Sequence, residues 1–430
     1  ASGVVRRVLT RTRMGGSALG GRKWTLTSSR TRSSASPPIL CSVVLLVAHS
    51  VTAPAAAMLH PADFLALQFI RKAMDDLPGS SFFASWDFTA DPCAFSGVVC
   101  SGDHVVTLSL GDPLASSPGL SGHLDPALGR LSALEELSLV PGRVVGPLPP
   151  AVGQLTRLRF LALGRNFLSG TIPTELGSLR LLGTLDLSFN QLTGDIPAAL
   201  AGMPALSNLI LCHNHLSGGV PPFTSPSLVR LDLKRNNLTG GVPALPASLQ
   251  YLSLAGNRLT GPVDGALSRL ARLTHLDLGM NQLTGPIPPC VFSFPIADLR
   301  LQRNRFYGPV RPEAATAVAV TTVDLSYNRL SGEVPPALAV ARRLYLNNNR
   351  FTGEVAAGFW ERLLQREMEV LYLQHNFLTG MEMDPAAEMP ASSSLCLQYN
   401  CMVPPPQNTC PVKAGRQRTR PTAQCVEWKG

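Results

Sequence analysis

The sequence predicts an α/β solenoid, a fold that grows by stacking one short strand-and-turn unit many times. Residues 182–197 read LGTLDLSFNQLTGDIP, and their template, L-x-x-L-x-L-x-x-N-x-L-x-G-x-I-P, recurs through residues 105–399. One asparagine recurs with it at intervals of 21 to 27 residues. Because a solenoid adds units rather than enlarging a single core, a chain of 430 residues needs no second globular domain.

The repeated unit resembles the plant extracellular type of leucine-rich repeat, whose pattern is L-x-x-L-x-L-x-x-N-x-L-x-G-x-I-P-x-x-L-G-x-L. The resemblance covers residues from about 62 to 425. It implies an arc with a parallel β-sheet on its concave side, short helices or 3₁₀ turns on its convex side, and a cap at each end. It also implies a secreted plant protein of the group that includes polygalacturonase inhibitors and receptor-like kinase ectodomains, which bind proteins, peptides or wall polysaccharides.

Residues 1–57 form a leader that differs in composition from the rest. They hold eight basic residues and no acidic one, and removing these eight from the 37 basic residues leaves 29 against 28 acidic ones. The formal net charge of +9 therefore belongs mostly to the leader. A near-neutral remainder argues against nucleic-acid binding.

The leader has the layout of a secretory signal. A basic stretch precedes the apolar run at residues 39–48, and small residues ending at Ala57 suit cleavage by signal peptidase. The run is too short to span a bilayer as a mature helix. We expect Met14 to lie closer to the true start, with residues 1–13 a gene-model extension. An organelle transit peptide, rich in Arg and Ser, is the alternative.

Residues 58–104 do not repeat, and we expect them to cap the first repeat. Residues 63–74 place apolar side chains at helical spacing, which predicts a short amphipathic helix. Trp86, Cys93 and Cys100 follow, an order that resembles the N-terminal cap of plant leucine-rich-repeat ectodomains. Two nearby cysteines behind a signal peptide favour a disulfide between Cys93 and Cys100. Two free, buried thiols are the alternative.

Residues 105–400 carry about 13 repeats, of which the first is degenerate and the second has Gly142 in place of the asparagine. In L-x-x-L-x-L the side chains alternate, so the leucines form the core and the x residues face outward. The asparagine amide both donates and accepts at the turn, which predicts a ladder of stacked amides. The Ile-Pro or Val-Pro that follows suits the first turn of a short outer helix. The predicted ladder consists of Asn166, Asn190, Asn214, Asn236, Asn257, Asn281, Asn304, Asn328, Asn349, Asn376 and Asn400.

Residues 401–430 complete a C-terminal cap that contains cysteines. We expect Cys396, Cys401, Cys410 and Cys425 to pair among themselves, although the sequence does not choose among the three possible pairings. Cys212 and Cys290 should stay free, because they lie three copies apart. The sequence shows no stretch of about 20 apolar residues here, so we expect no transmembrane anchor. The segment VPPP and the run KAGRQRTR depart from the usual polygalacturonase-inhibitor ending, so inhibition is not inferred.

Signatures of catalysis are absent from the sequence, including G-x-S-x-G, H-E-x-x-H, C-x-x-C and the kinase motifs. His213 and His215 lack further metal ligands nearby, so we interpret them as surface histidines. Asp186, Asp232, Asp277 and Asp324 share one strand position and are interpreted as solvated residues. We therefore expect no enzyme activity, no metal and no cofactor. A wall enzyme and a structural wall protein without a specific ligand are the alternatives to a recognition scaffold.

The outward strand positions change in character along the chain. Early copies carry mild residues such as Ala162, Thr184 and Ser188, whereas later copies carry Arg and Tyr. Arg grips carboxylates in two-point geometry, and Tyr offers a flat surface with a polar tip. We predict an acidic ligand, either a peptide or protein with exposed carboxylates or a pectin-like polysaccharide, held on the C-terminal half by Arg235, Arg300, Arg303, Arg343, Tyr345, Tyr372 and His375.

A single N-glycosylation sequon, Asn237-Leu238-Thr239, lies next to the ladder residue Asn236. Asn237 occupies an outward position, so we expect it to carry a glycan in the extracellular space or cell wall. The alternative is that the motif is simply the repeat's own N-N-L-T-G without a sugar.

Overall fold

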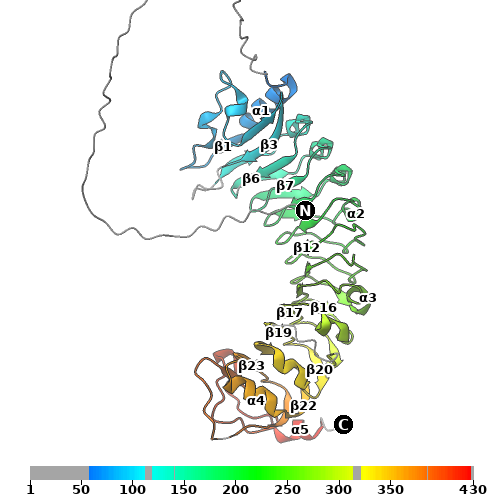
Figure 1. Cartoon of the computed structure of the whole chain (residues 1–430), viewed down its shortest axis with the longest axis vertical. Helices are drawn as coiled ribbons and strands as arrows, with labels where there is room; N and C mark the ends of the chain where they lie inside the picture. The colour runs from blue at the N-terminus through cyan, green and yellow to red at the C-terminus, as the bar shows by residue number, and fades with distance from the viewer. Residues whose placement is uncertain (1–57, 112–118, 140, 313–320, 385, 428–430) are drawn as a thin grey trace, which may run out of the picture. The chain divides into compact units, whose positions relative to one another are not determined.

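The computed structural model describes residues 58–427, apart from residues 112–118, 140, 313–320 and 385. The predicted leader, residues 1–57, lies outside the described residues. From residue 58 onward the elements follow one another along the stack in sequence order (Figure 1), from α1 near the start to α5 near the end.

The N-terminal cap begins with helix α1, Pro61–Ala73, which buries Ala66, Leu67 and Ile70. The predicted helix is thus present, although Met74 begins a short strand, β1 (Met74–Asp76), instead of ending the helix. Two 3₁₀ turns follow, η1 (Phe82–Ser85) and η2 (Pro92–Ala94). Trp86 is buried among phenylalanines, its indole N–H donates to the carbonyl of Ser96 at 3.0 Å, and a disulfide joins Cys93 to Cys100 as expected.

One long sheet runs through the described repeats. Strand β2 (Val98–Ser101) pairs antiparallel with β3 (His104–Leu110), and every later strand of this sheet adds in parallel register. The parallel sheet predicted from the sequence is therefore confirmed, with thirteen parallel strands in the described part of the chain. After β3 they are β5 (Glu136–Leu139), β7 (Phe160–Ala162), β9 (Thr184–Asp186), β11 (Asn208–Ile210), β12 (Arg230–Asp232), β13 (Tyr251–Ser253), β15 (His275–Asp277), β17 (Asp298–Arg300), β19 (Thr322–Asp324), β21 (Arg343–Tyr345), β23 (Val370–Tyr372) and β25 (Ser394–Cys396).

The central leucine of each strand lies beside the central leucine of its neighbours. Leu185 pairs with Leu161 on one side and with Leu209 on the other, and all three are fully buried. Burying a leucine side chain contributes roughly 1.5–3 kcal/mol relative to leaving it in water. Repetition of this contact forms one core that extends through the described repeats.

The turn that follows the main strand also forms a short strand in most copies, which the sequence analysis did not predict. These strands pair into separate small sheets. They were not predicted because the L-x-G segment is too short to show a clear alternation of apolar and polar residues. A glycine with positive φ lies at the end of most of these segments, such as Gly170 at 77° and Gly194 at 73°. The strands are β4 (Leu120–His123), β6 (Arg143–Pro147), β8 (Phe167–Thr171), β10 (Gln191–Thr193), β14 (Thr260–Gly261), β16 (Gln282–Leu283), β18 (Tyr307–Pro309), β20 (Arg329–Gly332), β22 (Arg350–Val355) and β24 (Phe377–Met381).

Short helices form the remaining side of the repeats, as predicted. The proline of the Ile-Pro pair often stands just before the turn rather than inside it, as Pro173 and Pro197 do. The structure has the following outer elements: η3 (Pro126–Arg130), η4 (Pro150–Gln154), η5 (Thr174–Ser178), α2 (Ala198–Ala201), α3 (Asp264–Leu267), η6 (Pro289–Ser293), η7 (Pro336–Val340) and α4 (Ala357–Leu364).

The asparagine amides form the predicted ladder. The side-chain nitrogen of Asn214 donates to the carbonyl oxygens of Leu187 and Leu211 at 3.0 and 3.1 Å, and its oxygen accepts from the amide of Leu192 at 3.0 Å. Asn190 and Asn236 make the corresponding bonds in the neighbouring copies. Each buried amide thus links three backbone groups, two of which belong to the preceding copy of the repeat.

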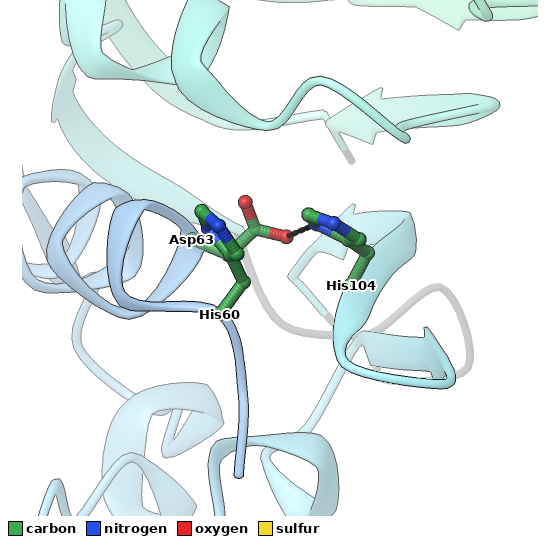
Figure 2. Close-up of side chains that lie close together, drawn as sticks. All are labelled: His60, Asp63 and His104. Carbon is green, nitrogen blue, oxygen red and sulfur yellow. Dashed lines mark hydrogen bonds and ion pairs between the residues drawn. The ribbon is translucent and has the colours of Figure 1, made fainter. Parts of the chain in front are cut away.

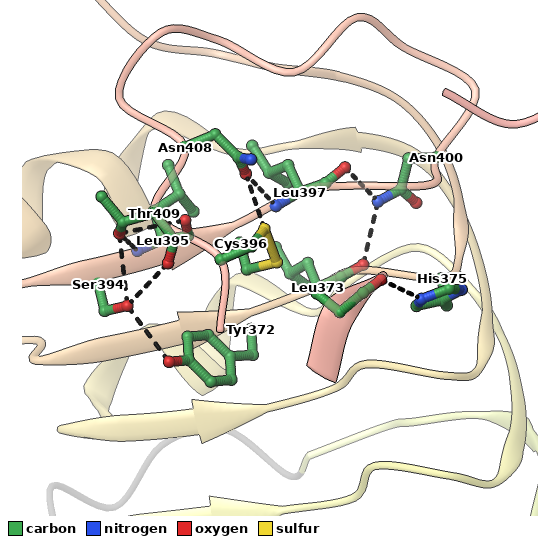
Figure 3. Close-up of a disulfide and its surroundings, with 12 residues drawn as sticks. Tyr372, Leu373, His375, Ser394, Leu395, Cys396, Leu397, Asn400, Asn408 and Thr409 are labelled. Atoms are coloured by element: carbon green, nitrogen blue, oxygen red, sulfur yellow. Dashed lines mark hydrogen bonds between the residues drawn. A yellow bond between two sulfur atoms is a disulfide. The ribbon is translucent and has the colours of Figure 1, made fainter. Parts of the chain in front are cut away.

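The C-terminal cap packs its loop against β25 (Figure 3). The side-chain oxygen of Asn408 accepts from the amide of Leu397 at 2.6 Å, and Thr409 exchanges backbone and side-chain bonds with Leu395. Disulfides join Cys396 to Cys410 and Cys401 to Cys425, one of the three pairings that the sequence left open. The cap ends with η8 (Val412–Ala414) and α5 (Thr422–Glu427).

The other cysteines agree with the predicted register. Cys212 is buried with a free thiol, and none of the three disulfides in the described residues joins it to Cys290. Burial raises the pKa of the Cys212 thiol to about 11, so the thiol stays protonated at neutral pH.

Candidate functional site

The outward strand positions form columns of neighbouring side chains, and the later columns hold four of the predicted ligand-binding residues. Arg300 of β17 pairs in register with Asp324 of β19, which pairs with Tyr345 of β21, which in turn pairs with Tyr372 of β23. Arg343 occupies the parallel column on β21. We call Arg300, Arg303, Arg343, Tyr345 and Tyr372 the strand patch.

Carboxylates accompany the arginines of the strand patch. The guanidinium of Arg343 pairs with Glu369 at 2.8 Å, and the neighbouring Arg342 pairs with the same carboxylate at 2.6 Å. The hydrogen bond from Arg342 holds the pKa of Glu369 below its usual value. Arg300 stands between Asp277 and Asp324 in its column. The patch is therefore a mixed surface of both charges, not a uniformly cationic one.

The two tyrosines of the strand patch lie edge to face, with ring centroids 5.5 Å apart and planes at 81°. Both are half-buried, and burial raises the pKa of Tyr345 above its ordinary value. The hydroxyl of Ser394 donates to the Tyr372 hydroxyl oxygen at 3.3 Å, which ties this ring to the last strand. The tyrosines are held in place before any ligand arrives.

Three of the predicted residues do not lie on the strands, contrary to the sequence analysis. Arg235, Arg303 and His375 each precede a ladder asparagine and adopt left-handed backbone, with φ of 55°, 57° and 61°. The left-handed residue turns the backbone just before the asparagine, so that the asparagine side chain can bond to the preceding copy. The same turn directs the side chain of the left-handed residue away from the strand. Arg303 lies over the ring of Tyr327, with its guanidinium carbon 4.4 Å from the centroid.

His375 and Arg235 are not counted in the strand patch, for different reasons. The imidazole Nε2 of His375 lies 2.9 Å from the carbonyl oxygen of Ala414, so the C-terminal cap occupies this side chain. Arg235 is exposed and lies just before Asn236, whereas Arg303 lies just before Asn304, three copies later. At about 4.8 Å per strand that places it roughly 14 Å along the stack. The structure therefore places Arg300, Arg343, Tyr345 and Tyr372 on neighbouring strands of one sheet, with Arg303 at the turn that follows β17.

The sequence analysis missed a groove in the early copies. The guanidinium of Arg165 lies over the Phe189 ring at 4.4 Å, and Phe189 stacks on His213 at 4.1 Å with planes at 12°. Burial, with the nearby Arg235 charge, lowers the pKa of His213 below its usual value. A hollow of about 750 Å³ opens beside this stack, and we call it the Arg–Phe groove; its lining is Pro141, Gly142, Arg143, Arg165, Asn166, Phe167, Phe189, Asn190, Gln191 and His213.

The Arg–Phe groove was missed because its side chains lie at the turns and on the small strands β6, β8 and β10, and not on the long parallel sheet. All eleven residues that precede a ladder asparagine have φ between 54° and 67°, and they follow one another in successive copies. The signal was present in the sequence as the residue before each asparagine. Reading that position alone along the chain finds Arg165, Phe189 and His213 in three consecutive copies.

The strand aspartates are buried or only partly exposed, which corrects their interpretation as solvated residues. Asp232 is only 1% exposed and lies 3.5 and 3.6 Å from the side-chain nitrogens of Arg230 and Lys234. Burial raises the pKa values of Asp277 and Asp324. Each carboxylate accepts a hydrogen bond from the backbone amide two residues later, for example that of Gly279 at 3.0 Å. The aspartates hold the end of the strand.

Family models identify the repeated unit and its cap. A leucine rich repeat N-terminal domain matches residues 60–101, and leucine rich repeat models match residues 154–216, 248–270, 272–294 and 319–340. No helix among the described residues has the length and apolar character needed to cross a membrane.

Solved structures share the fold. A TDR receptor structure is 27% identical with a TM-score of 0.58, covering 70% of this chain and 57% of that one. The ectodomain of the plant membrane receptor kinase GASSHO1/SCHENGEN3 from Arabidopsis thaliana, in complex with CASPARIAN STRIP INTEGRITY FACTOR 2, is 27% identical with a TM-score of 0.56, covering 79% and 47%. A plant ice-binding protein is 25% identical with a TM-score of 0.52, covering 78% and 99%.

The chain spans about half the length of the two receptors it matches. Its disulfides and its ectodomain-like fold fit an extracellular protein. Taken with the cap, the parallel sheet and the asparagine ladder, these likenesses identify the chain as a leucine-rich repeat protein of the plant extracellular type.

Proposed function

We propose that this protein is a secreted recognition scaffold that binds an extended peptide, or an exposed segment of a protein, on the strand patch. The observation that carries the proposal is the placement of Arg300, Tyr345 and Tyr372 on the same outward column of neighbouring strands. Aromatic rings beside guanidinium groups can bind both a side chain and a carboxylate.

The charges favour a peptide over a polyanion on this surface. A pectin-like chain carries a carboxylate on nearly every unit, and it would meet Asp277, Asp324 and Glu369 as well as the arginines. A peptide can place one carboxylate near Arg303 and present neutral groups to the rest. Arg303 is exposed and stacks on Tyr327, so its guanidinium is oriented in advance.

The protein is proposed to act by binding and not by catalysis. The aligned carboxylates of the strands are engaged with backbone amides, as Asp277 is with Gly279 and Asp324 with Ser326. A general acid or base must instead be positioned to reach a substrate proton. The relative from Arabidopsis thaliana was solved as a complex with another factor, which also supports a binding role.

A second candidate is binding of an acidic wall polysaccharide in the Arg–Phe groove. Its lining includes Arg143 and Arg165 and contains neither Asp nor Glu. Sugar rings also stack on exposed aromatic rings, and Phe167 is exposed, whereas the Phe189 ring is already in contact with Arg165 and His213. This site is the better match for a uronic-acid polymer, whereas the strand patch is the better match for a peptide.

The test uses two matched charge reversals in the purified protein. Arg300→Glu with Arg303→Glu alters the strand patch, and Arg143→Glu with Arg165→Glu alters the groove by the same number of charges. Each variant is immobilised and exposed to a pool of extracellular plant peptides, and separately to polygalacturonate, at low and high salt. Thermal unfolding of every variant is measured so that a misfolded protein is recognised.

We expect the strand-patch variant to lose at least tenfold in peptide retention while the groove variant keeps it. If peptide retention depends on Arg143 and Arg165 instead, the peptide binds in the early copies and the proposed site on the strand patch is wrong. Polygalacturonate retention lost only in the groove variant would establish the second candidate. If the folded wild-type protein retains neither probe, both binding proposals fail and the alternative function is that of a structural wall protein without a specific ligand.

A further inference from the structure

Two histidines and one aspartate meet where helix α1 approaches the hairpin of β2 and β3 (Figure 2). His60 precedes the helix, Asp63 lies in its first turn, and His104 begins β3. One ligand atom from each of the three side chains lies within 4.8 Å of the other two. Sequence analysis did not find this cluster because His104 is 41 residues from Asp63.

Asp63 is the buried member of the cluster, with no exposed surface. One carboxylate oxygen, Oδ2, accepts from the amide of Val105 at 2.9 Å and lies 3.1 Å from Nδ1 of His104. The other oxygen, Oδ1, is buried and has no hydrogen-bond partner among the described residues. Burying a carboxylate oxygen without a partner is unfavourable in free energy. A cation or a proton donor bound at this oxygen would remove that penalty.

The two imidazoles stand face to face, with centroids 4.7 Å apart and planes at 26°. Nδ1 of His60 accepts from the amide of Ala62 at 3.3 Å, which shows that this nitrogen carries a lone pair. That bond is long and is easily exchanged for a stronger ligand. His60 is exposed, so the cluster is open to solvent on one side.

Asp103 provides a second carboxylate behind the cluster. Its oxygen lies 4.0 Å from Nε2 of His104, the nitrogen that faces away from Asp63. A histidine that binds a metal through one nitrogen usually donates its other N–H to a carboxylate or carbonyl. The amide of His60 also donates to the carbonyl oxygen of Asp103 at 2.7 Å, so the hairpin and the start of the helix are already held together.

We propose that His60, Asp63 and His104 bind a divalent transition-metal ion of the zinc class, with solvent in the fourth position. Two imidazoles and a carboxylate match the ligands that Zn²⁺ prefers. Bonds of about 2.0–2.1 Å at tetrahedral angles require ligand atoms about 3.3 Å apart, so the most widely separated ligand atoms must close by at most roughly 1.5 Å, while His104 and Asp63 are already 3.1 Å apart. His60 has the freedom to do so because its side chain is exposed.

The bound ion would join the start of α1 to β3 and so strengthen the N-terminal cap. Its role is structural, because the cluster lies in the cap and not on the strand patch or in the Arg–Phe groove.

The test titrates the full-length protein, with its disulfides intact and EDTA removed, with ZnCl₂ by calorimetry and follows thermal unfolding in parallel. We expect one ion per chain and a higher unfolding temperature with zinc. MgCl₂ should produce neither effect, because magnesium prefers a shell of oxygen ligands. Addition of CoCl₂ should give the visible absorption of a four-coordinate cobalt site.

His60→Ala and His104→Ala should each weaken zinc binding by at least tenfold, whereas His213→Ala with His215→Ala should leave the one-to-one binding intact. Because His60→Ala also alters the start of the helix, the readout is the zinc-dependent shift and not the unfolding temperature itself. Asp63→Asn keeps an acceptor for Val105 but removes the charge, and it should abolish the shift. Zinc binding that survives all three single substitutions, or no binding by the wild-type protein, overturns the proposal.

Discussion

The side-chain amide of Asn214 reaches the carbonyl oxygen of Leu187, 27 residues earlier, at 3.0 Å. The same carbonyl accepts from Asn190 at 3.1 Å, so two successive ladder amides share one acceptor. The ladder is thus a continuous network that connects neighbouring strands through their turns. Its contribution to stability can be measured one amide at a time.

Replacing Asn214 with Ala should destabilise the protein by about 1–3 kcal/mol, because the buried amide of Leu192 loses its side-chain acceptor and the carbonyls of Leu187 and Leu211 each lose one of two ladder donors. Chemical denaturation of the protein made without glycosylation checks the change. Asn237→Ala is the matched control, since Asn237 is the next residue and is exposed. Equal stability of the two variants would contradict the role assigned to the ladder.

Peptide mapping without reduction should recover Cys396 linked to Cys410 and Cys401 linked to Cys425. The double variant Cys401→Ser with Cys425→Ser opens a link between residues 24 apart and should cost roughly 3 kcal/mol, because the unfolded chain regains freedom. Thermal unfolding measures this loss. Recovery of a peptide that links Cys401 to Cys410 would show that the cap folds differently.

Asn237 should carry an N-linked glycan when the protein is secreted from plant cells. Both Asn237 and Thr239 are exposed, and Asn237 makes no bond of the ladder, so the transferase can reach the site without disturbing the stack. Glycosidase treatment should increase the electrophoretic mobility of the wild type and leave Asn237→Gln unchanged. If treated and untreated wild type migrate together, the motif is only part of the repeat.

Asp277 should make stability depend on pH in a defined direction. Burial raises the pKa of its carboxyl in the folded protein above that in the unfolded chain. Its contribution to stability is therefore fully present below the unfolded pKa of about 3.9 and is lost as the pH rises through the folded value. Asp277→Asn should unfold at a higher temperature than the wild type at pH 7.

The advantage of Asp277→Asn should vanish near pH 3, where the wild-type carboxyl is protonated in both states. Asparagine retains an oxygen that can accept from the amide of Gly279, so the local hydrogen bond need not be lost. Asp264→Asn, at an exposed position, serves as the control. A gain that is equal at pH 3 and pH 7 would mean that burial of the charge is not its cause.

The sequence by itself determined the repeat, the parallel sheet and the ladder. Leu185 and Asn190 occupy positions that recur in nearly every copy, and only a stack of strands satisfies both the apolar alternation and the buried amides. The Cys93–Cys100 disulfide could also be predicted from the sequence, because these two cysteines lie close together in the cap and have few other possible partners.

Only the tertiary structure decided which side chains meet. Arg303 was expected on a strand, but the left-handed turn before Asn304 moves it to the ring of Tyr327. His375 was expected to be available to a ligand, but the cap's Ala414 lies against it. His60, Asp63 and His104 show no shared motif, because their proximity comes from a helix folding back on a hairpin. A repeated sequence pattern determines which residues occupy the strands, the core and the ladder. Contacts at the turns and in the caps depend on the path of the backbone, which the repeat period does not specify.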